Sequence, residues 1–243
     1  MWPPALAPPI QRRPYPVPIV ARRRSARFAP CLLAALLVAW SPPSARAAVF
    51  HWTGLDPGNA SWNSILNWDI GVPPNDGTAD IVISAGGLHP DPIVGAPWSI
   101  RSLTFNDSQA HTLTGSTLSV GAGGISNSGA GAALISNSIQ LLATQTWMSI
   151  GPLTLSGPVA LGPYPLDVSP GAPMSLYGVV SGAGALHKLG PGLLVLGAAG
   201  TYTGGTRIDF GTLQTLGDHF IPVATLVMRG GTLDLTGNVE TIG

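Results

Sequence analysis

The amino-acid sequence predicts an all-β fold, a right-handed parallel β-helix or β-solenoid with a tryptophan-rich N-terminal cap. Short runs with apolar residues at every second position, such as Leu153-Thr154-Leu155, are typical of strands. Glycine or proline interrupts these runs every few residues, which leaves no room for helical crossovers. On composition alone a β-sandwich stays open as the alternative fold.

Internal repeats favour the solenoid over the sandwich. A Gly-Thr-Leu step at 211–213 recurs at 231–233, twenty residues later, and Ile-Ser-Asn-Ser at 125–128 recurs at 135–138. A period near twenty matches one coil of a solenoid, in which each coil buries its apolar face against its neighbours. At that period, roughly ten coils are expected to follow residue 48.

Residues 1–47 are predicted to be a signal peptide. Seven of the eleven Lys and Arg residues lie there, followed by an apolar run over 31–40 that is too short to span a bilayer. Ala45-Arg46-Ala47 suits a signal peptidase, so we expect cleavage between Ala47 and Ala48. The chain would then be exported by the secretory translocase, with an uncleaved anchor as the alternative.

The charge of residues 48–243 excludes several functions. Four basic and eleven acidic residues give a formal net charge of −7, and the bases are scattered. Such a domain has no basic patch for phosphates, so we expect no nucleic-acid partner. The chain's one cysteine, Cys31, lies in the predicted signal peptide, which excludes thiolate-bound zinc and a cysteine nucleophile from the exported part. We expect no cofactor and a monomer.

Residues 48–98 are predicted to form the cap, because four tryptophans gather there: Trp52, Trp62, Trp68 and Trp98. Large rings can close the open end of a solenoid, where a terminal coil would expose apolar core. The alternative is an aromatic platform for sugars, made by Trp52, Trp62 and Trp68.

Two further sets of side chains are weaker candidates for sites. Calcium prefers carboxylate oxygens, which are present at Asp76, Asp80 and Asp91, but their spacing matches no calcium loop. Acid–base catalysis on a polysaccharide would need carboxylates and a base on one face, and the candidates are Asp209, Asp218 and His219. We favour the simpler interpretation that Asp209 forms a solvated ion pair with Arg207, and predict no metal site and no enzyme.

Residues 182–213 resemble the autotransporter-associated β-strand repeat, also called the passenger-associated transport repeat. That family shows a ladder of Lys, Gly and Leu, then Thr-Tyr-Thr-Gly-Gly-Thr and Gly-x-Leu. The positions in register are Lys188, Gly190, Gly192, Leu194, Leu196, Gly197, Tyr202, Thr203, Gly204, Gly205, Thr206, Gly211 and Leu213. The tryptophan-rich opening and the segment from Ile135 to Trp147 are also similar to such passengers.

The sequence departs from this family at several points. Gly200 stands where the family has Asn, and Leu193 and Val195 stand where it has Thr or Ser, so we expect a more apolar outer face at this repeat. The repeat lies within residues 99–243, which are the predicted solenoid. The chain stops at Gly243 within an apparent coil, and we expect it to be the N-terminal part of a passenger without its barrel.

The resemblance implies a non-catalytic surface stalk or adhesin-like passenger, exported to the cell surface or, without a barrel, to the periplasm. Its partner would be a host-cell or matrix glycan or protein. The alternative function is a secreted β-helix protein that binds or cleaves polysaccharide. A third reading is a nonfunctional remnant of a longer gene.

Overall fold

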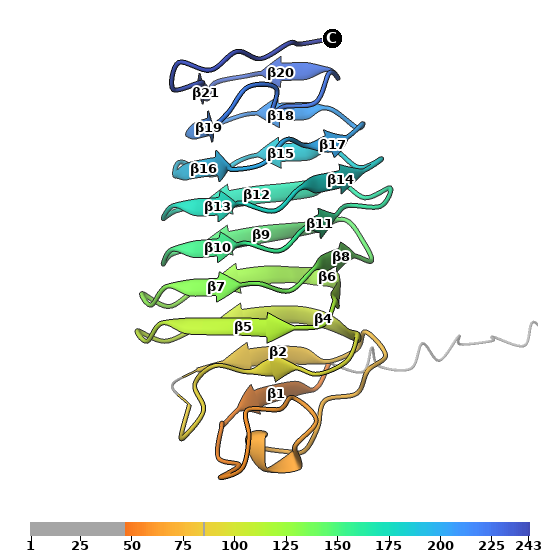
Figure 1. Ribbon diagram of the computed structural model, residues 1–243, viewed down its shortest axis with the longest axis vertical. Helices are drawn as coiled ribbons and strands as arrows, with labels where there is room; N and C mark the ends of the chain where they lie inside the picture. The colour runs from red at the N-terminus through yellow and green to blue at the C-terminus, as the bar shows by residue number, and fades with distance from the viewer. Residues whose placement is uncertain (1–46, 85) are drawn as a thin grey trace, which may run out of the picture. The chain divides into compact units, whose positions relative to one another are not determined.

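The computed structural model describes residues 47–84 and 86–243, which form a stack of parallel strands (Figure 1). Ala45 and the rest of the predicted signal peptide lie outside these residues, apart from its last position, Ala47. Within the described part the one helical element is a short 3-10 turn, Ile65–Asn67. No helix there is long and apolar enough to cross a membrane.

The first sheet begins as a single ladder and then divides. Its first four strands are β1 (Val49–Trp52), β2 (Asp80–Ile83), β4 (Trp98–Phe105) and β6 (Leu118–Asn127). Because β6 is long, its two halves pair with different strands. The first half leads to β8 (Ile139–Leu141), β11 (Val159–Ala160), β14 (Val180–Gly182) and β17 (Thr201–Tyr202). The second half leads to β9 (Gln145–Ser149), β12 (Leu166–Pro170), β15 (Leu186–Lys188), β18 (Thr206–Ile208) and β20 (Leu226–Met228).

The second sheet supplies the remaining face of the stack. Its strands, in order, are β3 (Ile93–Val94), β5 (His111–Gly115), β7 (Ala133–Ile135), β10 (Leu153–Leu155), β13 (Met174–Leu176), β16 (Leu193–Leu196), β19 (Thr212–Thr215) and β21 (Thr232–Asp234). Residues that pair between neighbouring strands of this sheet are 19 to 22 positions apart in the sequence. The shortest separation is that of Leu194 and Leu213, and the longest is that of His111 and Ala133. The all-β solenoid with a tryptophan cluster near its N-terminal end is thus confirmed.

The structure differs from the expected number of coils, and it shows how the two Ile-Ser-Asn-Ser runs are placed. The stack has about seven turns rather than ten, because residues 48–92 are spent on β1, β2 and the loops of the cap before the second sheet begins at Ile93. The two Ile-Ser-Asn-Ser runs do not stack on each other: Ser126 pairs with Met148, whereas Ser136 hydrogen-bonds Ser156 at 3.0 Å. They lie half a coil apart, on different sheets.

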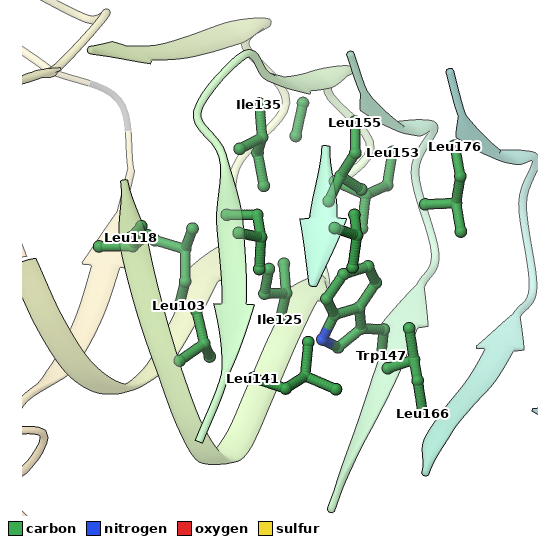
Figure 2. Close-up of a cluster of buried hydrophobic side chains, with 14 of the residues drawn as sticks. Leu103, Leu118, Ile125, Ile135, Leu141, Trp147, Leu153, Leu155, Leu166 and Leu176 are labelled. Carbon is green, nitrogen blue, oxygen red and sulfur yellow. The ribbon is translucent and has the colours of Figure 1, made fainter. Parts of the chain in front are cut away.

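Alternation along the short strands builds one continuous core. In β9, Gln145, Trp147 and Ser149 are buried while Thr146 and Met148 face outward. Inward residues of successive coils stack as columns, for example Leu153, Met174, Leu194 and Leu213. Figure 2 shows part of this core, in which Trp147 lies among aliphatic side chains that include Leu141, Leu153 and Leu166. Each fully buried aliphatic side chain contributes about 1.5–3 kcal/mol, so the columns account for much of the cohesion between coils.

Close stacking also explains glycine at particular corners. A Cβ on Gly131 would lie 1.8 Å from the carbonyl oxygen of Gln109 in the coil below, inside van der Waals contact. At Gly115, φ is +109° and a Cβ would lie 2.2 Å from the carbonyl oxygen of Val94. At both positions a side chain would force adjacent coils apart.

Candidate functional site

The three candidate tryptophans of the cap form one buried cluster. Trp68 meets Trp52 and Trp62 edge to face, with ring centroids 5.1 and 5.0 Å apart. Their exposed fractions are 1% for Trp52, 0% for Trp62 and 5% for Trp68. No ring presents a face to solvent, so a sugar could not stack on them without opening the cluster. Trp98 lies apart from this cluster, on β4, partly buried.

A buried asparagine holds the loop that carries these rings. The Asn67 side chain accepts a hydrogen bond from the Asp56 backbone N–H at 2.8 Å and donates to the carbonyl oxygens of Asn59 and Ser61 at 3.1 and 3.0 Å. Hydrogen bonds from Ser64 and from the loop backbone lower the pKa of Asp56. The loop is therefore tied together by polar contacts around an aromatic centre.

The three carboxylates considered for calcium have separate partners. Asp76 accepts hydrogen bonds from Thr78, which lower its pKa. Asp80 pairs with Arg101, and Asp91 accepts the Thr112 backbone N–H at 2.7 Å. Across residues 47–84 and 86–243, no three His, Cys, Asp or Glu side chains gather as metal ligands would.

The residues that resemble the passenger repeat lie in the coils toward the C-terminal end of the stack, from β15 to β19. Lys188 points inward from β15, in register with Val168 and Ile208, and is fully buried. Its Nζ donates to the carbonyl oxygen of Gly190 and, at 3.0 Å, to that of Phe210 in the next coil. Burial lowers the pKa of Lys188 to about 8. Lys188 therefore bridges two consecutive turns of the backbone.

Glycines of the same motif make space around these contacts. Gly211 has a φ of +67°, and a Cβ there would lie 2.6 Å from the Lys188 Nζ. A Cβ on Gly190 or Gly192 would meet the Pro170 carbonyl oxygen at 2.6 or 2.7 Å. The spacing of the motif's lysine and glycines in the sequence is thus explained by a single corner of the coil, where the Lys188 side chain and the backbone of the neighbouring coil leave no room for other side chains.

The aromatic part of the motif closes the neighbouring corner. The Tyr202 hydroxyl and Thr206 Oγ1 are 2.6 Å apart, and burial raises the Tyr202 pKa to about 12. Gly205 takes a φ of +85° between them, while Thr203 and Gly204 are exposed. The motif leucines point into the core, at Leu194, Leu196 and Leu213. Val195, expected on an apolar outer face, is only 7% exposed, whereas Leu193 is half-buried.

The candidate acid–base residues do not converge. Asp209 Oδ2 accepts a hydrogen bond from Arg207 Nε at 3.1 Å, which is the ion pair expected from the sequence, although Asp209 is only 15% exposed. Asp218 accepts the Val239 backbone N–H at 2.7 Å, and His219 Nδ1 faces Thr241 at 3.4 Å. None of the hydrogen bonds among the described residues joins these three side chains.

Stacking assembles a polar cluster that the sequence analysis missed. His187 lies between Asp167 and Arg207 on adjacent strands, and its Nδ1 is 2.9 Å from Asp167 Oδ1. Arg229 Nε lies 4.0 Å from Asp209 Oδ1. We call Asp167, His187, Arg207, Asp209 and Arg229 the charged row. Arg207 and Asp209 are two residues apart, but the other neighbouring members are twenty apart in the sequence, so the coil period was the available signal.

A second outward feature is a groove of about 360 Å³ that crosses β4, β6, β9 and β12. Thr104, Ser126, Met148 and Ser169 lie in register along it. Hydroxyls line it together with three apolar side chains, Met148, Ile150 and Pro191, and no charged residue borders it. Met148 and Ile150 are 53% and 72% exposed. This surface suits uncharged contacts with a partner.

Comparison with known proteins gives one relative and no structural match. No family model and no solved structure matches this chain. Over 111 residues the chain is 39% identical to the adhesin BmaC autotransporter of Brucella suis biovar 1 (strain 1330). That stretch is 45% of this chain but 3% of the relative, so the chain spans a small fraction of the relative's length. The predicted resemblance to an autotransporter passenger is confirmed by this adhesin relative together with the solenoid fold.

Proposed function

We propose that the exported part of this chain is an adhesin-like, non-catalytic passenger segment of an autotransporter, displayed at the cell surface. The observation that carries the proposal is the unbroken parallel stack, joined to 39% identity with an adhesin autotransporter. A stack of this kind presents outward rows of side chains at fixed spacing on a stiff support, which suits contact with another surface.

The arrangement of charged residues supports a role without catalysis. Each carboxylate considered for chemistry is engaged by a neighbouring arginine or backbone N–H. A glycosidase-like reaction needs two carboxyl groups facing one bond at a defined separation. Asp209 and Asp218 instead belong to separate hydrogen-bonding groups.

Adhesion is tested directly with beads that carry the purified chain. Beads coated with the wild-type protein should bind cultured host cells or matrix more than albumin-coated beads do. A matched control is the Gly131→Ala variant, whose stack we expect to be disrupted. Equal binding by wild-type and albumin beads would overturn the adhesin proposal.

Export and the alternative function need their own readouts. N-terminal sequencing of the secreted chain should return Ala48 as the first residue if cleavage follows Ala47. Release of reducing ends from a polysaccharide by the purified chain would contradict the non-catalytic proposal. Such release would favour the secreted polysaccharide-cleaving protein instead.

A further inference from the structure

The arginine end of the charged row differs from the rest of the exported part in charge. Arg207 and Arg229 share one carboxylate, that of Asp209, at 3.1 and 4.0 Å. The other carboxylate of the row, Asp167, pairs with His187 and lies two strands from Arg207, about 10 Å by strand spacing. Arg207, Arg229 and Asp209 therefore carry one net positive charge, on a domain whose formal net charge is −7.

The guanidinium groups have free donors. Arg207 uses its Nε for Asp209, and within residues 47–84 and 86–243 no hydrogen bond or ion pair uses the terminal nitrogens of either arginine. Arg207 is 28% exposed and Arg229 is 65% exposed, so these nitrogens are accessible. The planar fork of an arginine matches the oxygens of a carboxylate or a sulfate.

A small hollow lies beside Arg207. It has a volume of about 120 Å³ and is bordered by His187, Arg207, Thr225 and the Gly204-Gly205 turn. The buried residues Gly205 and Thr206 line it together with the side chains of Arg207, Thr225 and Val227. This volume fits one anionic group rather than a folded segment of a partner.

The sheet around the hollow disfavours a peptide as the ligand. A peptide is commonly captured as an added strand at a free sheet edge. Here β15 is already paired with β12 and β18, and β18 with β15 and β20. Recognition at this face has to use side chains and hydroxyls, which suits a sugar.

We propose that the hollow beside Arg207 binds an anionic sugar, a uronic-acid or sulfated residue of a polysaccharide, with Arg207 holding its acidic group. Arg229 does not border the hollow, but it shares Asp209 with Arg207 and adds positive charge to this end of the charged row. His187 and Thr225 border the hollow and contact the ring hydroxyls. The inference rests on the proposed adhesin function and names the class of ligand for it.

The test measures binding of the purified chain to four immobilised polymers: polygalacturonate, dextran sulfate, uncharged dextran and polyglutamate. We expect binding to at least one anionic polysaccharide, weakening as salt is raised. The two anionic polysaccharides distinguish a carboxylate from a sulfate. Tighter binding to polyglutamate than to either would overturn the sugar assignment in favour of an acidic peptide.

Variants locate the site. The double variant Arg207→Gln with Arg229→Gln should bind the preferred polymer about tenfold more weakly, as expected for loss of charge-assisted hydrogen bonds. Arg101→Gln is the matched control, because Arg101 is also an exposed arginine paired with one aspartate. Equal weakening by both changes would show general charge attraction and overturn the site. An unchanged urea midpoint verifies that each variant is folded.

Cell adhesion separates failure of this inference from failure of the proposed function. If wild-type beads adhere to cells while the chain binds neither anionic polysaccharide, the sugar site is wrong and adhesion stands. If the chain neither adheres nor binds, both proposals are overturned.

Discussion

The buried amine of Lys188 makes stability depend on pH in a defined direction. Burial lowers its pKa from 10.5 to about 8, which penalises the folded state by up to about 3 kcal/mol at neutral pH. Between about pH 8 and pH 10.5 the folded chain holds fewer protons at this site than the unfolded chain. Stability therefore rises with pH across that window.

The perturbation that isolates this effect is Lys188→Met, which keeps the aliphatic stem in its inward column. The variant loses the charge and also leaves the carbonyl oxygens of Gly190 and Phe210 without their donor. These two effects oppose each other at pH 7. From pH 7 to pH 10, however, the wild-type chain should gain about 2 kcal/mol relative to the variant, because only the wild type carries the titrating amine.

Two measurements check the reasoning. Urea unfolding of both proteins at several pH values gives the difference in free energy of unfolding. Because Lys188 is the only lysine in the chain, NMR of lysine-labelled protein follows a single amine and should show a midpoint near 8. A constant difference in free energy from pH 7 to pH 10, or a midpoint near the ordinary lysine pKa, would refute the argument.

Three other substitutions test the packing. Trp147→Ala removes the largest ring of the mid-stack core and should lower the free energy of unfolding by about 3–5 kcal/mol in urea titrations. Gly131→Ala, whose Cβ would meet the Gln109 carbonyl oxygen at 1.8 Å, should cost more than about 2 kcal/mol. Gly95→Ala is its control, with no neighbour within 3.8 Å, and equal losses would contradict the stacking argument. Asn67→Ala should cost about 2–4 kcal/mol and shift tryptophan fluorescence to the red, and an unchanged spectrum would contradict its role in the cap.

The coil period could be predicted from the sequence because some residues that stack on each other in successive coils are of the same type. Gly-Thr-Leu recurs because Thr212 and Leu213 stack directly on Thr232 and Leu233. The same logic did not extend to Ile-Ser-Asn-Ser, because Asn127 and Asn137 each turn inward at different corners and hydrogen-bond different backbone carbonyls. Two corners of the same coil can therefore require the same residue types, so a sequence that recurs at corners need not recur at the coil period.

The charged row shows why the candidate site was harder to predict. Pairing Asp167 with His187 requires a register of twenty residues, yet coil lengths from β2 onward vary from 19 to 22. A shift of one residue would turn His187 into the core and Lys188 outward. Asp209 and Arg207, only two residues apart, could therefore be predicted as partners, whereas pairs from neighbouring coils could not.

The parallel stack also determines how much length the protein gains for each residue in its chain. Each coil of about twenty residues advances the stack by one strand spacing, about 4.8 Å, whereas the same residues in an α-helix would extend about 30 Å. About seven turns thus reach roughly 34 Å. In return, backbone hydrogen bonds between coils and the buried columns resist bending at each step. Duplicating or deleting one coil's worth of codons would change the reach by a fixed increment and leave every other contact in register.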